Sequence, residues 1–385
     1  MIQATSLIPT EISSMPAKLS PGEPGSFAAF TLERRMPAIL AGLQAHADTS
    51  TRQALHQLAA EIPQGSITPL PAAIFGELGQ SIAPHCGLRW HEAPFLDVEL
   101  YFYARILLAF GYTPAIAADP FAAVKFRATQ QAIAWLAGTP CYSDPARSIT
   151  AIIRWAVTSN SADLSQLTTA DQNQISLLVD DSQAVADLLH AAPQRIDFVL
   201  DNAGLDVLAD LLLIRALCRK GLRVAAHVRP YPMFVSDLTL SDLEHLLATL
   251  AGNPVSSIQQ LGEESIAAIQ SGQLTIHVSP ALGLPICFCE DRARTAATFG
   301  DADLVIFKGD LNYRYFVGDR HWPHTTAKQR FAERFGRPAI ALRSLKSEVL
   351  VGLSVETQAQ TGQLEPAWLT NGHHGIIQVF SGNCL

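Results

Sequence analysis

A short stretch in the middle of the chain, RIDFVLDNAGLD (residues 195–206), places Asp201 and Asn202 directly after an apolar run and before a helical pattern. Carboxylate and amide oxygens are ligands that a hard divalent cation prefers, so the pair could bind a metal ion. Asp and Asn also commonly end a strand and cap the helix that follows. Taken alone, the pair does not distinguish a metal site from a turn.

Three later apolar runs also end in polar side chains, and the charges of these side chains are complementary. The first run delivers a carboxylate, Asp237, whereas the other two deliver mostly cations. The polar residues that follow those two runs are Lys308, Asp310, Asn312, Arg314, Arg343 and Lys346. Because acidic oxygens hold a metal ion and Arg and Lys hold phosphate oxygens, the four runs together favour a metal beside a phosphate. Singly, Asp237 could be a helix cap and Lys346 a surface lysine.

The periodicity of the chain predicts the elements that must position these residues. Between residues 27 and 137 apolar side chains recur at spacings of three and four, which predicts helices. From about residue 174 short β-rich runs alternate with helical stretches, notably 204–221 and 239–252, which predicts crossover units and a mostly parallel sheet. The β-rich runs are ISLLVD, IDFVLD, LRVAAHV, LTIHVS, DLVIFKG, AIALRS and GIIQVF. Ligands of such sheets bind at the carboxyl ends of the strands.

We therefore expect an α/β fold, with a three-layer α/β/α core, a mostly parallel Rossmann-like sheet and an N-terminal all-helical lobe. The chain has 385 residues, which exceeds the usual size of one compact unit. The predicted division is an extended arm over residues 1–26, a helical lobe over 27–150 and the α/β core, which would carry the metal site, over 151–385.

Composition and missing motifs exclude several classes of protein. A net charge of −8 without a dense basic run argues against a nucleic-acid partner. No apolar run is long enough for a membrane span, and the N-terminal residues lack a signal-peptide pattern, so we expect a cytoplasmic protein. The phosphate-loop, dinucleotide, zinc-protease and serine-hydrolase motifs are absent. The stretch DADLV (301–305) imitates an aspartyl-nucleophile signature, but its acids precede a strand instead of following one.

Four separated segments together resemble a known family. They are DNAGLDVLADL, VRPYPMFVSDLT, KGDLNYRYFVGDRHW and LRSLKSEVLVGL. In this order they resemble the DUF89 family, the metal-dependent damage-control phosphatases, and within it the branch of the acidic residue methyltransferase 1-like proteins. The segments FTLERRMPAIL, ELYFYARIL and WLTNGHHGIIQVF extend the resemblance over roughly residues 27–380.

The resemblance implies a helical lobe packed on an α/β/α core and one divalent metal ion, Mn, Co, Ni or Mg, at the strand ends. By the family's pattern the metal ligands are Asp201, Asn202 and Asp237. The catalytic residues that it implies are Asp201, Asn202, Asp310, Asn312, Arg314 and Lys346, and the substrate-binding residues are Asn312, Arg314, Lys346, Lys308 and Glu99. The chain departs from the family at Asp206, where relatives often have Glu, and at Ala104, where they often have Arg.

The expected activity is hydrolysis of small phosphorylated metabolites, chiefly sugar phosphates such as fructose phosphates, by a metal-activated water. Two alternatives stay open. Carboxyl methyltransfer from S-adenosylmethionine is the first, although the usual glycine-rich loop after the first strand is missing. A non-catalytic protein that binds metal and phosphate is the second. The expected partner is a small phosphorylated metabolite, with neither nucleic acid nor membrane, and the sequence does not predict an oligomeric state.

Overall fold

The computed structural model describes residues 15–139, 148–160, 175–191 and 193–382, and its centre is a seven-stranded sheet. The strands are β1 (Ser176–Asp180), β2 (Arg195–Val199), β3 (Arg223–Val228), β4 (Leu274–Val278), β5 (Leu304–Lys308), β6 (Ala339–Ser344) and β7 (His374–Phe380). Their order across the sheet is β1-β7-β6-β5-β2-β3-β4. All neighbours are parallel except β6 and β7. The seven strands coincide with the seven predicted β-rich runs, and the α/β fold class is confirmed.

Alternating side chains along the strands contribute to two hydrophobic clusters, one on each face of the sheet. On β2, for example, Phe198 belongs to one cluster and Val199 to the other, as a period of two requires. The helices that share the cluster of Phe198 are α6 (Ala122–Gly138), α8 (Ile149–Ser159), α9 (Ser182–His190), α10 (Leu205–Arg219), α11 (Leu240–Ala251) and α12 (Ser256–Gln270). The helices that share the cluster of Val199 include α13 (Arg292–Phe299), α14 (Asp310–Val317) and α15 (Gln329–Phe335).

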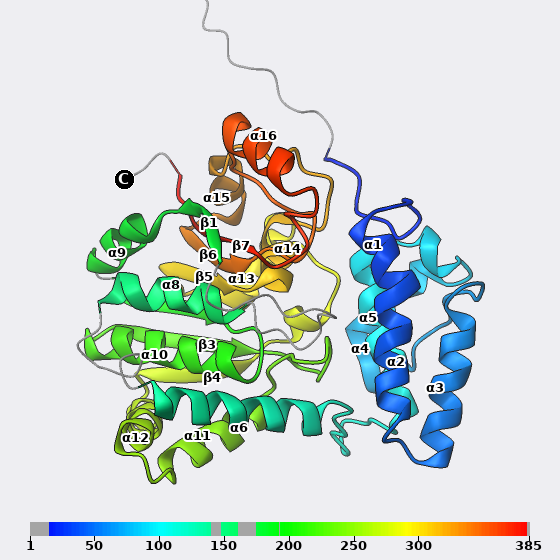
Figure 1. Ribbon diagram of the computed structural model, residues 1–385, viewed down its shortest axis with the longest axis horizontal. Coiled ribbons are helices and arrows are strands. Elements are labelled where there is room, and N and C mark those ends of the chain that lie inside the picture. Colours follow the sequence, from blue (N-terminus) through cyan, green and yellow to red (C-terminus); the bar gives the residue numbers. More distant parts are fainter. Residues whose placement is uncertain (1–14, 140–147, 161–174, 192, 383–385) are drawn as a thin grey trace, which may run out of the picture.

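The N-terminal helices form a stack beside the sheet, on the right in Figure 1. They are α1 (Phe27–Phe30), a π-helical turn (Thr31–Arg35), α2 (Met36–Gln44), α3 (Thr49–Glu61), α4 (Ala72–Ile82) and α5 (Phe95–Ala109), with 3₁₀ turns at Ala83–His85 and Trp90–Glu92. The remaining elements are a 3₁₀ turn at Pro280–Gly283 and α16 (Val355–Leu364). The cluster of Val199 also contains side chains of these N-terminal helices, so the stack and that side of the core share one hydrophobic cluster.

Helix α6 lies with the core and not with the N-terminal stack. It contacts α10, α11 and α12, and its Ala132, Ile133 and Leu136 belong to the cluster of Phe198. The division into a helical lobe over 27–150 and a core from 151 stays a prediction. The packing of α6 assigns this helix to the core. Below, "helical lobe" means α1–α5.

The described part of the predicted arm, from residue 15, runs alongside the segment after α14. Lys18 forms an antiparallel bridge with Arg320, and the backbone N–H of Leu19 donates to the carbonyl of Asp319 at 3.0 Å. Residues 1–14 lie outside the described part of the chain. Among the described helices, none combines the length and the apolar character that a membrane crossing needs.

Candidate active site

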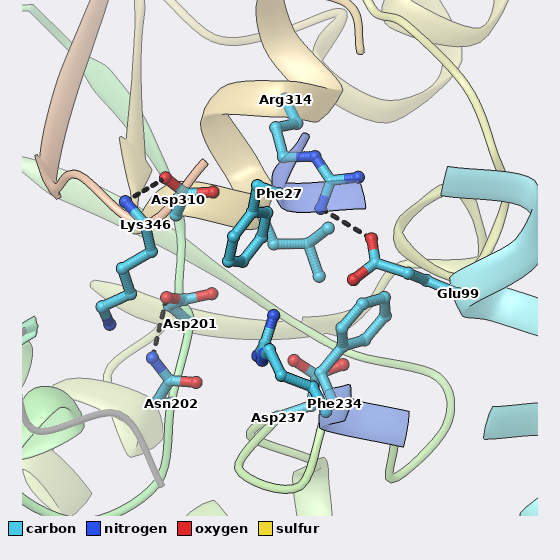
Figure 2. A pocket seen from close by; sticks show the side chains of 11 residues that line it. Phe27, Glu99, Asp201, Asn202, Phe234, Asp237, Asp310, Arg314 and Lys346 are labelled. Atoms are coloured by element: carbon cyan, nitrogen blue, oxygen red, sulfur yellow. Dashed lines mark hydrogen bonds and ion pairs between the residues drawn. The ribbon is translucent and has the colours of Figure 1, made fainter. Parts of the chain in front are cut away.

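A pocket of about 40 Å³ opens where the carboxyl ends of β2, β5 and β6 meet the helical lobe (Figure 2). Core and lobe both contribute side chains to it. The residues that line it are Phe27, Arg35, Glu99, Asp201, Asn202, Phe234, Asp237, Asp310, Leu311, Arg314 and Lys346. The sheet topology alone explains the convergence, because β2, β5 and β6 are parallel and their carboxyl ends share one edge.

The three predicted metal ligands lie together on the core side of this pocket. Asp201 and Asn202 follow β2, and the loop from β3 to α11 brings Asp237 into an antiparallel bridge with Asn202. The N–H of Leu238 donates to the carbonyl of Asp201 at 2.9 Å, and the N–H of Ala203 donates to that of Ser236 at 2.8 Å. All three side chains are about 95% buried or more. Two carboxylates and an amide therefore face one small space.

The loop that carries Asp237 holds an unfavourable backbone conformation. Phe234 and Val235 have φ of 50° and 68°, and they are the only non-glycine residues with positive φ in the described chain. Such a conformation costs about 1–3 kcal/mol per residue and is especially unusual for a β-branched valine. The ring of Phe234 lines the pocket and packs against Tyr103 of the lobe at a centroid distance of 4.7 Å. Packing across the pocket thus helps to hold the strained loop.

A buried arginine, Arg229, lies between the two carboxylates. Its guanidinium is 3.6 Å from Asp201 and 3.7 Å from Asp237, and it donates to Oδ1 of Asn312 at 2.8 Å. One cation shared by two buried carboxylates lowers the cost of keeping both ionised. Arg229 stands in VRPYPMFVSDLT, one of the four segments that resemble the family. The sequence did not predict a role for this residue.

The carboxylate of Asp201 is enclosed on one side by two amides and a glycine. The Nδ2 groups of Asn160 and Asn202 donate to its Oδ2 at 3.1 and 2.8 Å. Gly309, the residue before α14, has φ of 85° and lies so close that a Cβ there would overlap this carboxylate. Gly309 stands in the segment KGDLNYRYFVGDRHW, whereas no motif in the sequence marks Asn160 as part of a site.

Asp310 and Lys346 form the next part of the wall. The backbone N–H of Lys346 donates to Oδ1 of Asp310 at 3.0 Å, and Nη2 of Arg343 is 2.8 Å from the same oxygen. The Nζ of Lys346 donates to the backbone carbonyl of Asn160. Asp310 therefore ties the segment after β6 to the start of α14.

Arg314 is held by two carboxylates that lie on different parts of the chain. Its Nη1 is 2.7 Å from Glu99 of α5, and its Nε and Nη2 bond Asp319 at 2.7 and 3.1 Å. Burial disfavours the charge on Arg314, but the carboxylates of Asp319 and Glu99 outweigh it and raise the pKa of this arginine. Burial in turn raises the pKa of Glu99, although Arg314 and Arg35 act in the opposite direction. The Glu99–Arg314 pair joins the helical lobe to the core at the pocket.

Two predicted substrate-binding residues, Lys308 and Asn312, do not line the pocket. Asn312 is fully buried, and its Nδ2 donates to the backbone carbonyls of Lys308 and Leu200 at 2.6 and 3.0 Å. The reason is helical geometry: Asp310 and Arg314 are four residues apart on one face of α14, and Asn312 points the opposite way. The geometry gives Asn312 a role in fixing the strand ends, and direct contact with a substrate stays a prediction for both residues.

The side chain of Lys308 leaves β5 on the face of the sheet that α10 covers. There it pairs with Asp206 and Asp210 of α10. Burial opposes its charge, but the two carboxylates prevail and raise its pKa to about 12. Burial raises the pKa of Asp210 to about 8, because one ammonium cannot neutralise two buried carboxylates equally. Asp206 also accepts from the side chains of Asn160 and Asn202 at 2.9 and 3.1 Å, so this cluster adjoins the metal ligands.

The helical lobe supplies pocket residues that the sequence did not single out as functional. Phe27 begins α1 and Arg35 ends the π-helical turn, and the guanidinium of Arg35 lies over the ring of Phe27 at 5.0 Å. Arg35 stands in the segment FTLERRMPAIL, and Phe27 lies three residues before it. π-helical turns within α-helices often occur at functional sites.

A sheet that gathers buried carboxylates and cations at its carboxyl edge, beneath a helical lobe, defines a protein that handles a small anionic ligand. Comparison with known proteins makes this specific: the chain belongs to the damage-control phosphatase ARMT1-like family, whose domain model matches residues 31–361. The predicted family resemblance is confirmed, and the chain is accordingly an enzyme of the phosphatase class.

Its relatives include several proteins named damage-control phosphatase ARMT1. The protein from Danio rerio is 31% identical over 334 residues, which cover 76% of this chain and 74% of that protein. The proteins from Xenopus laevis and Homo sapiens are 29% and 28% identical, with 75% of each chain covered. The crystal structure of a DUF89 family protein from Pyrococcus horikoshii superposes with a TM-score of 0.51 over 92% of this chain and 98% of its own, at 14% identity, which shows a shared fold.

Proposed function

We propose that the protein is a metal-dependent phosphatase that hydrolyses small phosphorylated metabolites, with sugar phosphates such as fructose phosphates as the expected substrates. The observation that carries the proposal is the content of one pocket, where buried Asp201 and Asp237 face Arg314 and Lys346. Membership in a family of phosphatases supports the activity, and the small volume of the pocket supports a small substrate.

The donor set fits a hard divalent cation. No group of three or more His, Cys, Asp or Glu in a metal-binding arrangement occurs within the described ranges, so a soft-metal or all-carboxylate site has no support there. Two carboxylates and one amide oxygen, from Asp201, Asp237 and Asn202, are instead the oxygen ligands that Mg²⁺, Mn²⁺, Co²⁺ or Ni²⁺ accept. Bound there, such an ion would polarise the phosphoryl group and lower the pKa of a coordinated water.

The remaining pocket residues have distinct roles in this proposal. Arg314 and Lys346 bind the phosphoryl oxygens and stabilise the charge that they carry in the transition state. Asp310 fixes the backbone of Lys346 and helps to orient the attacking water. Arg229 balances the charge of Asp201 and Asp237 from behind the site.

The helical lobe covers the rest of the substrate. Glu99 offers an acceptor for a hydroxyl group and Phe27 an apolar ring surface, and Phe234, on the core loop that carries Asp237, offers a second ring (Figure 2). A hydroxyl-rich leaving group with both polar and apolar faces, such as a sugar, matches these walls. The side chains of the lobe, together with Phe234, therefore select the alcohol, and the charged side chains of the core act on the phosphate.

Hydrolysis of p-nitrophenyl phosphate and of a panel of fructose phosphates, with EDTA or with each of the four metals, tests the proposal. The wild-type protein is expected to be active with metal and inactive with EDTA, and Asp201→Ala is expected to lose both metal binding and activity. Asp301→Ala is the matched control, because the Asp301 side chain is 88% exposed. An Asp201→Ala protein that still binds metal and turns over at the wild-type rate contradicts the proposal. Titration with S-adenosylmethionine tests the methyltransfer alternative.

A further inference from the structure

Asn160, the residue after α8, is completely buried and every polar group of its side chain has a partner. Its Nδ2 donates to Oδ2 of Asp201 at 3.1 Å and to Oδ2 of Asp206 at 2.9 Å. Its Oδ1 accepts from the backbone N–H and the hydroxyl of Ser344, at 3.1 and 3.0 Å. Its own carbonyl accepts from Nζ of Lys346. One asparagine thus joins the end of β2, the start of α10 and the end of β6.

The two oxygens of the Asp201 carboxylate are placed in different surroundings. Oδ2 accepts from the amides of both Asn160 and Asn202, and Gly309 closes its remaining side. Figure 2 shows the other oxygen on the side of Asp237 and the pocket. Amide donors on one oxygen fix the rotation of a carboxylate, as the partners of metal-binding side chains generally do. Oδ1 of Asp201 then lies on the cationic side of the site, 3.6 Å from the guanidinium of Arg229.

We infer that Asn160 is a positioning residue: its side chain fixes the rotation of the Asp201 carboxylate, which would bind the metal ion, and its carbonyl holds Nζ of Lys346 at the same pocket. The inference rests on the proposed metal-dependent phosphatase function. Ser344 fixes the orientation of the carboxamide, because two donors on Oδ1 direct its Nδ2 toward Asp201 and Asp206. The side chain of Asn160 therefore fixes the orientation of Asp201, the proposed metal ligand. Its backbone carbonyl fixes the position of Lys346, the proposed phosphate-binding lysine.

Substitution Asn160→Leu tests this inference, because leucine has the same branching at Cγ and lacks the amide donors and the carbonyl acceptor. Mn²⁺ alone is the probe, and free Mn²⁺ is counted by electron paramagnetic resonance in titrations of the wild-type and variant proteins. The expected result is a Kd for Mn²⁺ that rises about 10–100-fold, the usual effect of removing a hydrogen-bond partner of a metal ligand. Activity on p-nitrophenyl phosphate is then measured at saturating Mn²⁺, and we expect KM to change little, because leucine keeps the backbone carbonyl that accepts from Lys346.

Ser159→Ala is the matched control. Ser159 is the neighbouring residue and almost equally buried, but within the described residues its hydroxyl bonds the carbonyl of Ala156 in its own helix and no pocket residue. We expect its Kd for Mn²⁺ to equal that of the wild type. A purely structural role for Asn160 predicts a lower thermal midpoint for Asn160→Leu with an unchanged Kd, and this result would overturn the inference.

A milder variant covers the case in which Asn160→Leu does not fold. Ser344→Ala removes one of the two donors that orient the Asn160 carboxamide. We expect this variant to raise the Kd for Mn²⁺ several-fold. An unchanged Kd contradicts the inference. The wild-type protein separates this test from that of the function. If the wild type binds Mn²⁺ and hydrolyses no phosphate ester, the proposed function fails, and the effect of Asn160 on Mn²⁺ affinity is still decided by the variants.

Discussion

At the scale of single residues, the pocket depends on one close approach between backbone and side chain. Gly309 passes so near Asp201 that any Cβ would overlap the carboxylate. Its φ of 85° is also a conformation that glycine adopts readily and other residues do not. The glycine before α14 therefore allows β2 and β5 to bring Asp201 and Asp310 into the same pocket.

We predict that Gly309→Ala displaces the Asp201 carboxylate and weakens Mn²⁺ binding about 10–100-fold, with a similar loss of kcat/KM on p-nitrophenyl phosphate. Manganese titration and steady-state kinetics measure the two effects. Gly221→Ala is the control, since Gly221 has φ of 83° but no atom within 4 Å of its would-be Cβ. The Gly221→Ala control has the same unfavourable positive φ for alanine, but its new Cβ does not overlap another atom. Equal metal affinity in the two variants would contradict the prediction.

At the scale of elements, the π-helical turn between α1 and α2 changes which residues of the lobe face the core. The turn Thr31–Arg35 inserts a wider turn into the helix that runs from Phe27 to Gln44. Arg35 consequently lines the pocket with only 7% of its surface exposed, while its neighbour Arg34 is exposed. The lobe thus contributes a cation to a pocket whose other lining cations come from the core.

Arg35→Met is expected to raise KM for a phosphorylated substrate about tenfold and to change kcat less, because the cation acts in substrate binding on the lobe side of the pocket. Arg34→Met, one residue earlier and exposed, is expected to leave both constants unchanged. Steady-state kinetics with a fructose phosphate measures the difference. An Arg35→Met protein with wild-type KM would remove Arg35 from substrate binding.

At the scale of the whole molecule, the core keeps a charged cluster beneath the active site. Lys308 pairs with Asp206 and Asp210 on the face of the sheet that α10 covers, and neither Lys308 nor Asp210 is accessible to solvent. Such a cluster makes the stability of the fold depend on pH, because a buried carboxyl with a raised pKa keeps a proton that the unfolded chain releases.

For Asp210 the sign of this effect is defined. Its pKa is about 8 in the folded protein and near 3.8 when unperturbed, so its contribution to stability is complete below about pH 4 and is lost as the pH rises through 8. Asp210→Asn is therefore expected to show a free energy of unfolding that changes less between pH 5 and pH 8 than in the wild type. Urea unfolding at several pH values measures it, with Asp301→Asn as the exposed control. Parallel pH profiles for wild type and Asp210→Asn would refute the prediction.

The sequence by itself determined the elements and the family. Each β-rich run became a strand, and the stretches 204–221 and 239–252 became α10 and α11, because hydrophobic periodicity is a local property of the chain. It also identified the acidic and cationic strand ends, of which Asp201, Asn202, Asp237, Asp310, Arg314 and Lys346 share the pocket.

Only the tertiary structure decided which of these side chains face the pocket and what holds them there. Lys308 and Asn312 face away because the pleat of β5 and the turn of α14 direct them to other partners. Asn160 meets Asp201 across 41 residues and Lys346 across 186, and Arg229 meets Asn312 across 83. Such contacts depend on strand order and on the packing of the lobe, which local sequence patterns do not encode.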